Sequence, residues 1–379
     1  MFGKQFKLFS LFGFSVKIDL SWFIIVALVA WSLADGWFID PQRYPTLVHD
    51  ARLRWTMGIA GAAGLFISIV LHEFGHSLMA RRLGLPMRGI TLFIFGGVAE
   101  MGGEPATPWV EFLMTIAGPI VSLVVAGAFY LAARGPWPLP VHAVLLWLAF
   151  INAILVAFNL IPAFPLDGGR MLRAVLWAWK GNLRWATRIA SSIGAGFGIV
   201  MIVLGVVSVL TGNFVGGMWW FILGLFLHAA AKGSYQQLLI RKALEGEPVR
   251  QFMKPDPQVV RPDITLESLA QDYIYRCHYK MFPVLEVGRL IGCITTQQLK
   301  EVPRDHWAAE TVGQHTVPCS DQNTIGPDAD ALEALTTMHR TGRSRLLVVH
   351  HGHLAGILAL KDLMGFLSLK IELGDVAAG

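Results

Sequence analysis

The chain has 379 residues, of which 54% are hydrophobic and 15% are charged, and its formal net charge is +5. An average soluble domain carries about 25% charged residues, so this composition excludes an ordinary soluble enzyme, a disordered chain and a collagen-like chain. The sequence has no basic stripe with interleaved aromatic residues, so nucleic acid is not a predicted partner.

Six stretches are long and apolar enough to cross a hydrocarbon core about 30 Å thick, which takes roughly 20 residues of helix. They lie at about 18–34, 55–80, 110–133, 141–161, 189–210 and 214–231. Lysine and arginine concentrate in the loops on the side of the N-terminus, and the positive-inside rule then predicts that both termini are cytoplasmic. All three cysteines lie after residue 276 without Cys-x-x-Cys spacing, which agrees with a reducing compartment. We therefore predict a multi-pass protein of the cell membrane.

Residues 90–100, between the second and third stretches, are rich in β-branched and aromatic residues and contain the pair Gly96-Gly97. This segment is too short for a transmembrane helix. It predicts a β-hairpin that re-enters the membrane domain, where protein or a wet cavity must satisfy its backbone. A plain amphipathic linker is the alternative.

The part of the chain after residue 245 contains an internal repeat. Residues 282–285 and 291–294 recur as residues 346–349 and 355–358. Each copy predicts helix, strand, glycine turn, strand and helix, so the tail is predicted to form two stacked α+β modules, at about 246–308 and 309–370. The predicted fold is an α-helical polytopic membrane domain over residues 1–240, with six transmembrane helices and a re-entrant β-hairpin. An α+β tandem domain follows over residues 241–379.

The string His72-Glu73-Phe74-Gly75-His76 lies deep in the second apolar stretch. Residues four apart leave the same face of a helix, so His72 and His76 are predicted to bind one zinc ion, with Glu73 beside them as the general base. Ionisable groups at this depth are costly unless they are paired or bind a metal. A polar helix face that is satisfied internally is the alternative.

A zinc hydrolase needs a third protein ligand and keeps its fourth position for water. Asp167 is the best placed candidate, because it follows the fourth stretch in a segment with two prolines and the pair Gly168-Gly169. The prolines are expected to end the helix, and the glycines to let the backbone approach the metal closely. Capping the next helix is the competing role for Asp167. The other candidate ligands are Glu100, Glu104, Glu111, His142 and His228.

The His-Glu-x-x-His helix, followed after two further stretches by Asn-Leu-Ile-Pro-Ala-Phe-Pro-Leu-Asp-Gly-Gly-Arg at 159–170, resembles the site-2 protease family of intramembrane zinc metalloproteases. The repeated tail resembles a pair of cystathionine-β-synthase-type (CBS) modules, which one branch of that family carries. The resemblance covers nearly the whole chain. It implies that His72, His76 and Asp167 bind one Zn²⁺ per chain and that Glu73 is the catalytic carboxylate.

The same resemblance implies residues that bind the substrate. Asn159 would contact the substrate backbone or the developing oxyanion, and Phe95, Gly96 and Gly97 would belong to a hairpin that pairs with an extended substrate. A helical substrate must unwind before attack, and an edge strand supplies replacement hydrogen bonds. Asn152 fits either a route for water or a hydrogen bond between helices.

CBS-type pairs often bind adenosine nucleotides through a hydroxyl residue followed three positions later by an aspartate. The first repeat keeps the hydroxyl at Thr295 but lacks the acid, and the second keeps the acid at Asp362 but lacks the hydroxyl. Because neither pattern is complete, adenine nucleotide binding, homodimerisation and substrate docking all stay open for the tail.

The predicted function is that of an intramembrane zinc endopeptidase. It would cut membrane-protein substrates in or near their transmembrane segments, as in regulated intramembrane proteolysis, and its partners would be these substrates and the lipid bilayer. The alternative from another class is a CBS-gated membrane transporter for zinc or another ion. Transport would need polar ligands through several helices, whereas this sequence concentrates them at one depth. A catalytically silent scaffold is disfavoured by the complete set of four site residues.

Overall fold

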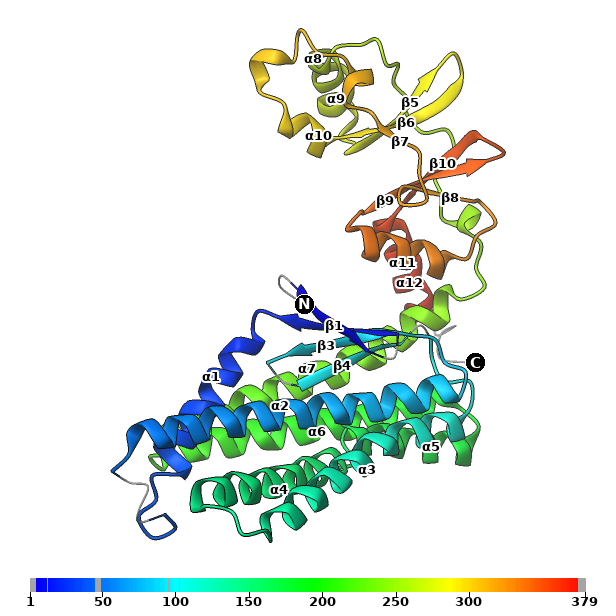
Figure 1. Ribbon diagram of the computed structural model, residues 1–379. Coiled ribbons are helices and arrows are strands. Elements are labelled where there is room, and N and C mark those ends of the chain that lie inside the picture. Colours follow the sequence, from blue (N-terminus) through cyan, green and yellow to red (C-terminus); the bar gives the residue numbers. More distant parts are fainter. Residues whose placement is uncertain (1–4, 12, 45–48, 95, 102, 374–379) are drawn as a thin grey trace. The chain divides into compact units, whose positions relative to one another are not determined.

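The structure is a computed structural model that describes residues 5–11, 13–44, 49–94, 96–101 and 103–373 (Figure 1). The chain divides into two compact units, Met1–Gln236 and Gln237–Gly379. The first unit combines a small sheet with helices. Their bounds are α1 (Trp22–Ser32), α2 (Ala51–Arg82), α3 (Pro108–Ala133), α4 (Leu139–Asn159), α5 (Asp167–Lys180), α6 (Leu183–Leu210) and α7 (Phe214–Leu244), the last of which continues into the second unit.

Local sequence explains where several of these helices begin and end. The side chains of Asp50, Thr107 and Asn182 accept hydrogen bonds from backbone N–H groups in the first turns of α2, α3 and α6. These residues therefore act as N-caps, which satisfy donors that have no partner inside the helix. Helix α5 ends at Gly181, whose φ of 68° is a conformation that glycine adopts without steric cost.

Five helices of the described residues are long and apolar enough to cross a membrane, namely α2, α3, α4, α6 and α7. The prediction of six is therefore wrong by one. The stretch at 18–34 begins inside a strand that ends at Asp19, and the apolar helix that follows, Trp22–Trp37, is shorter than the other five. Phe14, Val16 and Ile18 are all buried, and this alternation with a period of two belongs to a strand rather than to a helix.

A four-stranded sheet packs against α2 in the order β1 (Gln5–Leu11), β2 (Phe14–Asp19), β3 (Met87–Phe93) and β4 (Gly96–Met101). β2 and β3 run parallel, and β3 and β4 form an antiparallel hairpin over the segment where a hairpin was predicted. The sheet shares a buried apolar cluster with Phe74 of α2. β4 is an edge strand of this sheet, so within the described part of the chain no strand neighbours one side of its backbone.

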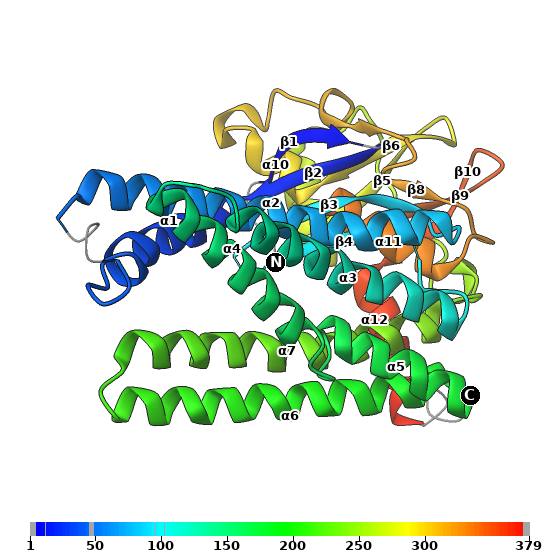
Figure 2. The same ribbon diagram turned by 60° about the horizontal axis from the view of Figure 1, so that its bottom comes forward.

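Helices α6 and α7 run side by side (Figure 2). A Cβ atom built at Gly198 of α6 would lie 2.7 Å from the backbone nitrogen of His228, and one at Gly205 would lie 2.6 Å from that of Phe221. Glycine at these positions lets the two backbones approach closely, as is common between membrane helices.

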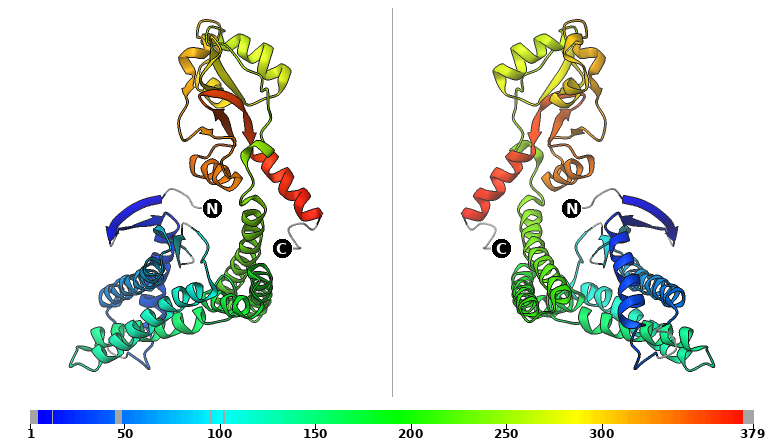
Figure 3. Two further views of the ribbon diagram at one scale, coloured as in Figure 1. Left: turned by 90° about the vertical axis from the view of Figure 1, so that its right-hand side faces the viewer. Right: turned by 90° about the vertical axis from the view of Figure 1, so that its left-hand side faces the viewer.

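The second unit contains two three-stranded sheets with short helices (Figures 1 and 3). Their orders are β5-β6-β7 and β10-β9-β8. The strands are β5 (Met281–Glu286), β6 (Arg289–Thr295), β7 (Val317–Pro318), β8 (Thr324–Ile325), β9 (Arg345–His350) and β10 (His353–Ala359). The helices are α8 (Leu266–Ser268), α9 (Tyr275–Cys277), α10 (Thr296–Glu301), α11 (Ala331–Thr341) and α12 (Leu360–Glu372). Each sheet has its own buried apolar cluster, so the repeat in the sequence corresponds to two similar modules.

Candidate metal centre

Two histidines of α2 and the first residue of α5 form the candidate metal centre. The Nε2 atoms of His72 and His76 lie 3.1 Å apart, and Oδ2 of Asp167 lies 3.1 Å from the first and 3.3 Å from the second. His72 is only 5% exposed, so these atoms meet inside the protein. Leu166 occupies the N-cap of α5, which leaves the Asp167 carboxylate for the centre.

The chemistry of these three side chains fits a zinc ion. His76 Nδ1 lies 2.9 Å from the carbonyl oxygen of Met114, and a carbonyl only accepts hydrogen bonds, so Nδ1 carries the proton. In a neutral His76 the Nε2 atom therefore presents a lone pair. That lone pair converges with Nε2 of His72 and with a carboxylate oxygen, which together make a ligand set of catalytic zinc sites.

Helix α3 borders the centre with small side chains. Ser122 Oγ lies 2.9 Å from His72 Nδ1, which holds this ring with its Nε2 atom toward Asp167. A Cβ atom built at Gly118 would lie 2.2 Å from His76 Nε2 and 2.8 Å from His72 Nε2. Only glycine at position 118 therefore leaves room for the two imidazoles.

The hairpin approaches the centre at Glu73. A Cβ atom at Gly97 of β4 would lie 2.5 Å from Glu73 Cγ and 2.8 Å from its Oε1, so the strand backbone packs directly on the carboxylate side chain. Gly96 begins the same strand with a φ of 132°, and Phe95 lies outside the described residues. Asn159 is the last residue of α4 and is partly buried.

Comparison with known proteins places the chain in a family. The profile of Peptidase family M50 matches residues 60–136 and 137–204, and that of the CBS domain matches 249–305 and 316–369. Two relatives whose names describe zinc metalloproteases, sll0528 of Synechocystis sp. and Rip3 of Mycobacterium tuberculosis, are each 33% identical to the chain. The matches cover 94% and 92% of this chain, and 93% and 89% of the relatives. The chain belongs to peptidase family M50.

Membership in family M50 makes the chain a zinc metalloprotease with a CBS tail, and the resemblance to site-2 proteases noted in the sequence is confirmed. Zinc metalloprotease MJ0392 of Methanocaldococcus jannaschii is also 33% identical to the chain. The match covers 82% of this chain and 86% of the length of MJ0392. The solved Site-2 Protease from Methanocaldococcus jannaschii is 28% identical, covers 61% of this chain and 94% of its own, and superposes with a TM-score of 0.44.

The alternative ligands considered from the sequence have other partners in this M50 chain. His142 and His228 each place Nδ1 against a backbone carbonyl, of Ala133 and Ala195 respectively. Glu104 and Glu111 both pair with Arg173. The side chain of Glu100 lies outside what the structure describes.

The structure gives Gly168, Gly169 and Asn152 structural roles rather than roles at the metal or in a water route. Cβ atoms at Gly168 and Gly169 would collide with the backbone of residues 160–164, so these glycines fold the loop before α5 tightly rather than bringing backbone to the metal. Asn152 is buried and donates from Nδ2 to Ser68 Oγ at 3.0 Å and to the Leu148 carbonyl oxygen at 2.8 Å. It therefore joins α4 to α2, which is the helix-contact role.

The residues of the predicted nucleotide pattern lie at the starts of two helices in the tail. Thr295 is the N-cap of α10 and accepts a hydrogen bond from the backbone N–H of Gln297, so its hydroxyl already has a structural role. Oδ2 of Asp362, in the first turn of α12, is buried and accepts no hydrogen bond from the described residues. Nucleotide binding by the tail stays a prediction.

Reasoning from sequence missed Met114, Gly118 and Ser122 of α3. Met114 acts through its main-chain oxygen, which leaves no signature in the sequence. Gly118 and Ser122 look like the small residues of any membrane helix. Their spacing of four from each other, matching that of His72 and His76, is the one signal that was available.

Proposed function

We propose that this M50 member is an intramembrane zinc endopeptidase that hydrolyses peptide bonds in or near the transmembrane segments of membrane proteins. Its zinc ligands are His72, His76 and Asp167, with one ion per chain, and Glu73 is the general base. The observation that carries the proposal is that the Asp167 carboxylate oxygen meets two imidazole nitrogens of α2, an apolar helix long enough to cross a membrane. His72 precedes the end of α2 at Arg82 by about 15 Å of helical rise, which supports a site below the membrane surface.

The residues of the candidate centre have different roles in the proposed hydrolysis. A bound zinc supplies Lewis-acid chemistry, because the cation polarises a carbonyl oxygen and makes water more acidic. Glu73 takes a proton from the attacking water and gives it to the departing amine nitrogen. Ser122 and the Met114 carbonyl oxygen hold the two imidazole rings in place during these steps.

The substrate backbone is proposed to add to β4 as a further strand. β4 is an edge strand, and its Gly97 lies against Glu73, so a segment paired with β4 passes close to the proposed base. Asn159, Gly96 and Phe95 are also proposed to contact the substrate.

Both termini are proposed to be cytoplasmic, because lysine and arginine concentrate in the loops on the side of the N-terminus. The CBS tail is proposed to regulate proteolysis, through dimerisation or an adenine nucleotide. Transport is not proposed, because the candidate ligands gather at one depth instead of continuing through several helices.

Cleavage of a transmembrane peptide tests the proposed function. Purified protein reconstituted in liposomes with a peptide that has a single apolar segment should give two products, whose masses place the cut within or beside that segment. Zinc removal by a chelator should stop the reaction, and added zinc should restore it. Products that arise only from the water-exposed flanks of the peptide would contradict an intramembrane site.

Proline at position 98 tests pairing along β4. Val98 pairs with Thr91 of β3, and proline there removes one backbone donor from the edge strand, where proline is best tolerated. Cleavage of the transmembrane peptide should fall about ten-fold, the effect of losing roughly 1.4 kcal/mol of transition-state binding, while zinc content stays unchanged. Val98→Ala is the matched control, because it shortens the side chain and keeps the N–H. Equal rates for the proline variant and this control would remove β4 from the proposal.

A further inference from the structure

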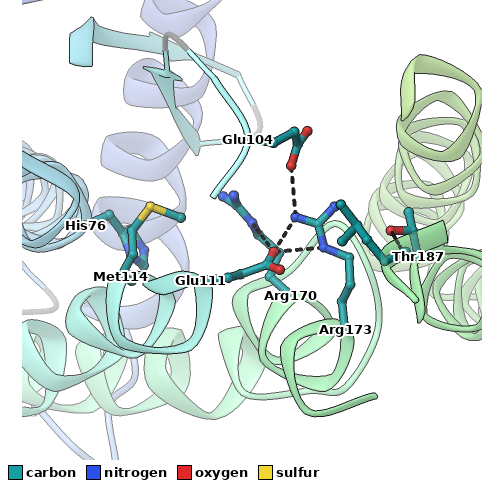
Figure 4. Close-up of polar contacts among 8 residues, drawn as sticks. His76, Glu104, Glu111, Met114, Arg170, Arg173 and Thr187 are labelled. Carbon is teal, nitrogen blue, oxygen red and sulfur yellow. Dashed lines mark hydrogen bonds and ion pairs between the residues drawn. The ribbon is translucent and has the colours of Figure 1, made fainter. Parts of the chain in front are cut away.

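A buried ion cluster joins α3 to α5 beside the candidate metal centre. Glu111 of α3 is 0% exposed, and its Oε1 accepts hydrogen bonds from Nε of Arg173 at 2.8 Å and from Nη2 of the same residue. Nε of Arg170 lies 3.8 Å from the same oxygen, and Glu104 pairs with Arg173 from the other side at 3.5 Å. Figure 4 shows the Glu111 carboxylate between the two arginine side chains. The four charges balance, as burial requires.

The two arginines belong to the helix that begins with Asp167. Arg170 lies one turn after Asp167, and Arg173 a further turn on, so an anchor on these residues fixes the direction of the first turns of α5. Arg173 also places its guanidinium 5.3 Å from the ring centre of Phe164, in the loop that leads into α5. The cluster therefore holds both the helix and the loop that position Asp167.

Glu111 stands at one end of a stripe along α3 whose members all touch the centre or its supports. Met114, Gly118 and Ser122 follow Glu111 at intervals of three, four and four residues, so they lie on one helix face. Met114 contacts the His76 imidazole through its carbonyl oxygen, and Ser122 contacts the His72 imidazole through its hydroxyl. Gly118 leaves room for both imidazoles because it has no side chain. Glu111 acts on the third proposed ligand indirectly, because its ion pairs with Arg170 and Arg173 hold α5, the helix that begins with Asp167.

We propose that Glu111 is a positioning residue for the metal, which keeps the Asp167 carboxylate on the two histidines by holding Arg170 and Arg173. The inference rests on the proposed zinc site. Removing one partner of a buried ion pair leaves the other charge uncompensated, so the loss of the Glu111 charge displaces the start of α5. Glu104 is 36% exposed, and water replaces much of its contribution.

Metal binding by Glu111→Gln tests this role without using proteolysis. The variant should lose zinc to a chelator at least about ten-fold faster than the wild type, the usual effect of removing a group that supports a metal ligand. The cobalt-substituted variant should show weaker visible d–d absorption at saturating cobalt, because Asp167 no longer completes the site. Glu104→Gln is the matched control and should stay within about two-fold of the wild type, as expected for an exposed pair.

A double variant distinguishes two causes of zinc loss: a displaced Asp167 carboxylate, and a buried arginine left without its partner. Glu111→Gln with Arg173→Gln removes one charge of each sign, so the cluster stays neutral, and the remaining Arg170 and Glu104 side chains are 22% and 36% exposed. This variant should fold even if the single variant does not. The proposal predicts that the double variant still loses zinc about ten-fold faster than the wild type. Wild-type retention and a wild-type cobalt spectrum in the double variant, or in a folded Glu111→Gln, would overturn it. Failure of the wild type itself to bind cobalt or zinc would instead contradict the proposed zinc site.

Discussion

Replacing Gly118 with alanine should empty the metal centre. The added methyl carbon would lie 2.2 Å from His76 Nε2 and 2.8 Å from His72 Nε2, which is closer than non-bonded atoms approach. The backbones of α2 and α3 pack closely here, because a Cβ at Gly75 of α2 would lie 2.9 Å from the Ala117 carbonyl oxygen, and moving the helices apart would lose this packing. The imidazoles must therefore rotate away from Asp167. Elemental analysis of the purified variant should find almost no zinc, and proteolysis should be lost with it.

Gly127→Ala is the matched control for this prediction. It lies on the same helix, and a Cβ there would meet no atom of the described residues within 4 Å outside its immediate surroundings in α3. Alanine in place of glycine in a helix interior is favourable by about 0.5–1 kcal/mol, so this variant should be folded and fully loaded with zinc. A full zinc complement in Gly118→Ala would show that α3 does not confine the imidazoles.

Glu73→Gln should abolish proteolysis while zinc binding persists. Glutamine has nearly the size and shape of glutamate, so the contact with Gly97 and the positions of His72 and His76 are preserved. The amide cannot take a proton from water, and loss of a general base costs about two to four orders of magnitude in rate. The measurement is the initial rate of cleavage of a transmembrane peptide in liposomes, with the zinc content determined on the same samples.

The sequence was sufficient to predict which side chains come together in the candidate metal centre. The spacing of His72 and His76 fixes their common helix face, and the proline-rich segment before Asp167 marks the turn that brings α5 back to α2. The structure brings these three residues within contact distance of one another. It also supplies groups that no motif could indicate, because Met114 contributes a backbone oxygen and Gly118 contributes only space.

The number of membrane-spanning helices was harder to predict than the site. The first apolar stretch joins the end of β2 to α1, and hydrophobicity alone does not distinguish a buried strand from a membrane helix. The parallel pairing of β2 with β3 joins residues 15–18 to 89–92, which are far apart in the sequence. No local pattern reports such a contact. The hairpin at 90–100 was visible because its strands are adjacent in the chain and a glycine pair begins the second of them.

The most direct test of zinc-dependent intramembrane proteolysis with Glu73 as the base compares wild type and Glu73→Gln in one experiment. Both proteins are loaded with zinc, reconstituted in identical liposomes with one transmembrane peptide, and assayed for products by mass spectrometry. We expect equal zinc in both samples, cleavage within or beside the apolar segment by the wild type, and a rate lower by at least about 100-fold in the variant. Equal cleavage by the two zinc-loaded proteins would contradict the assignment of Glu73 as the base.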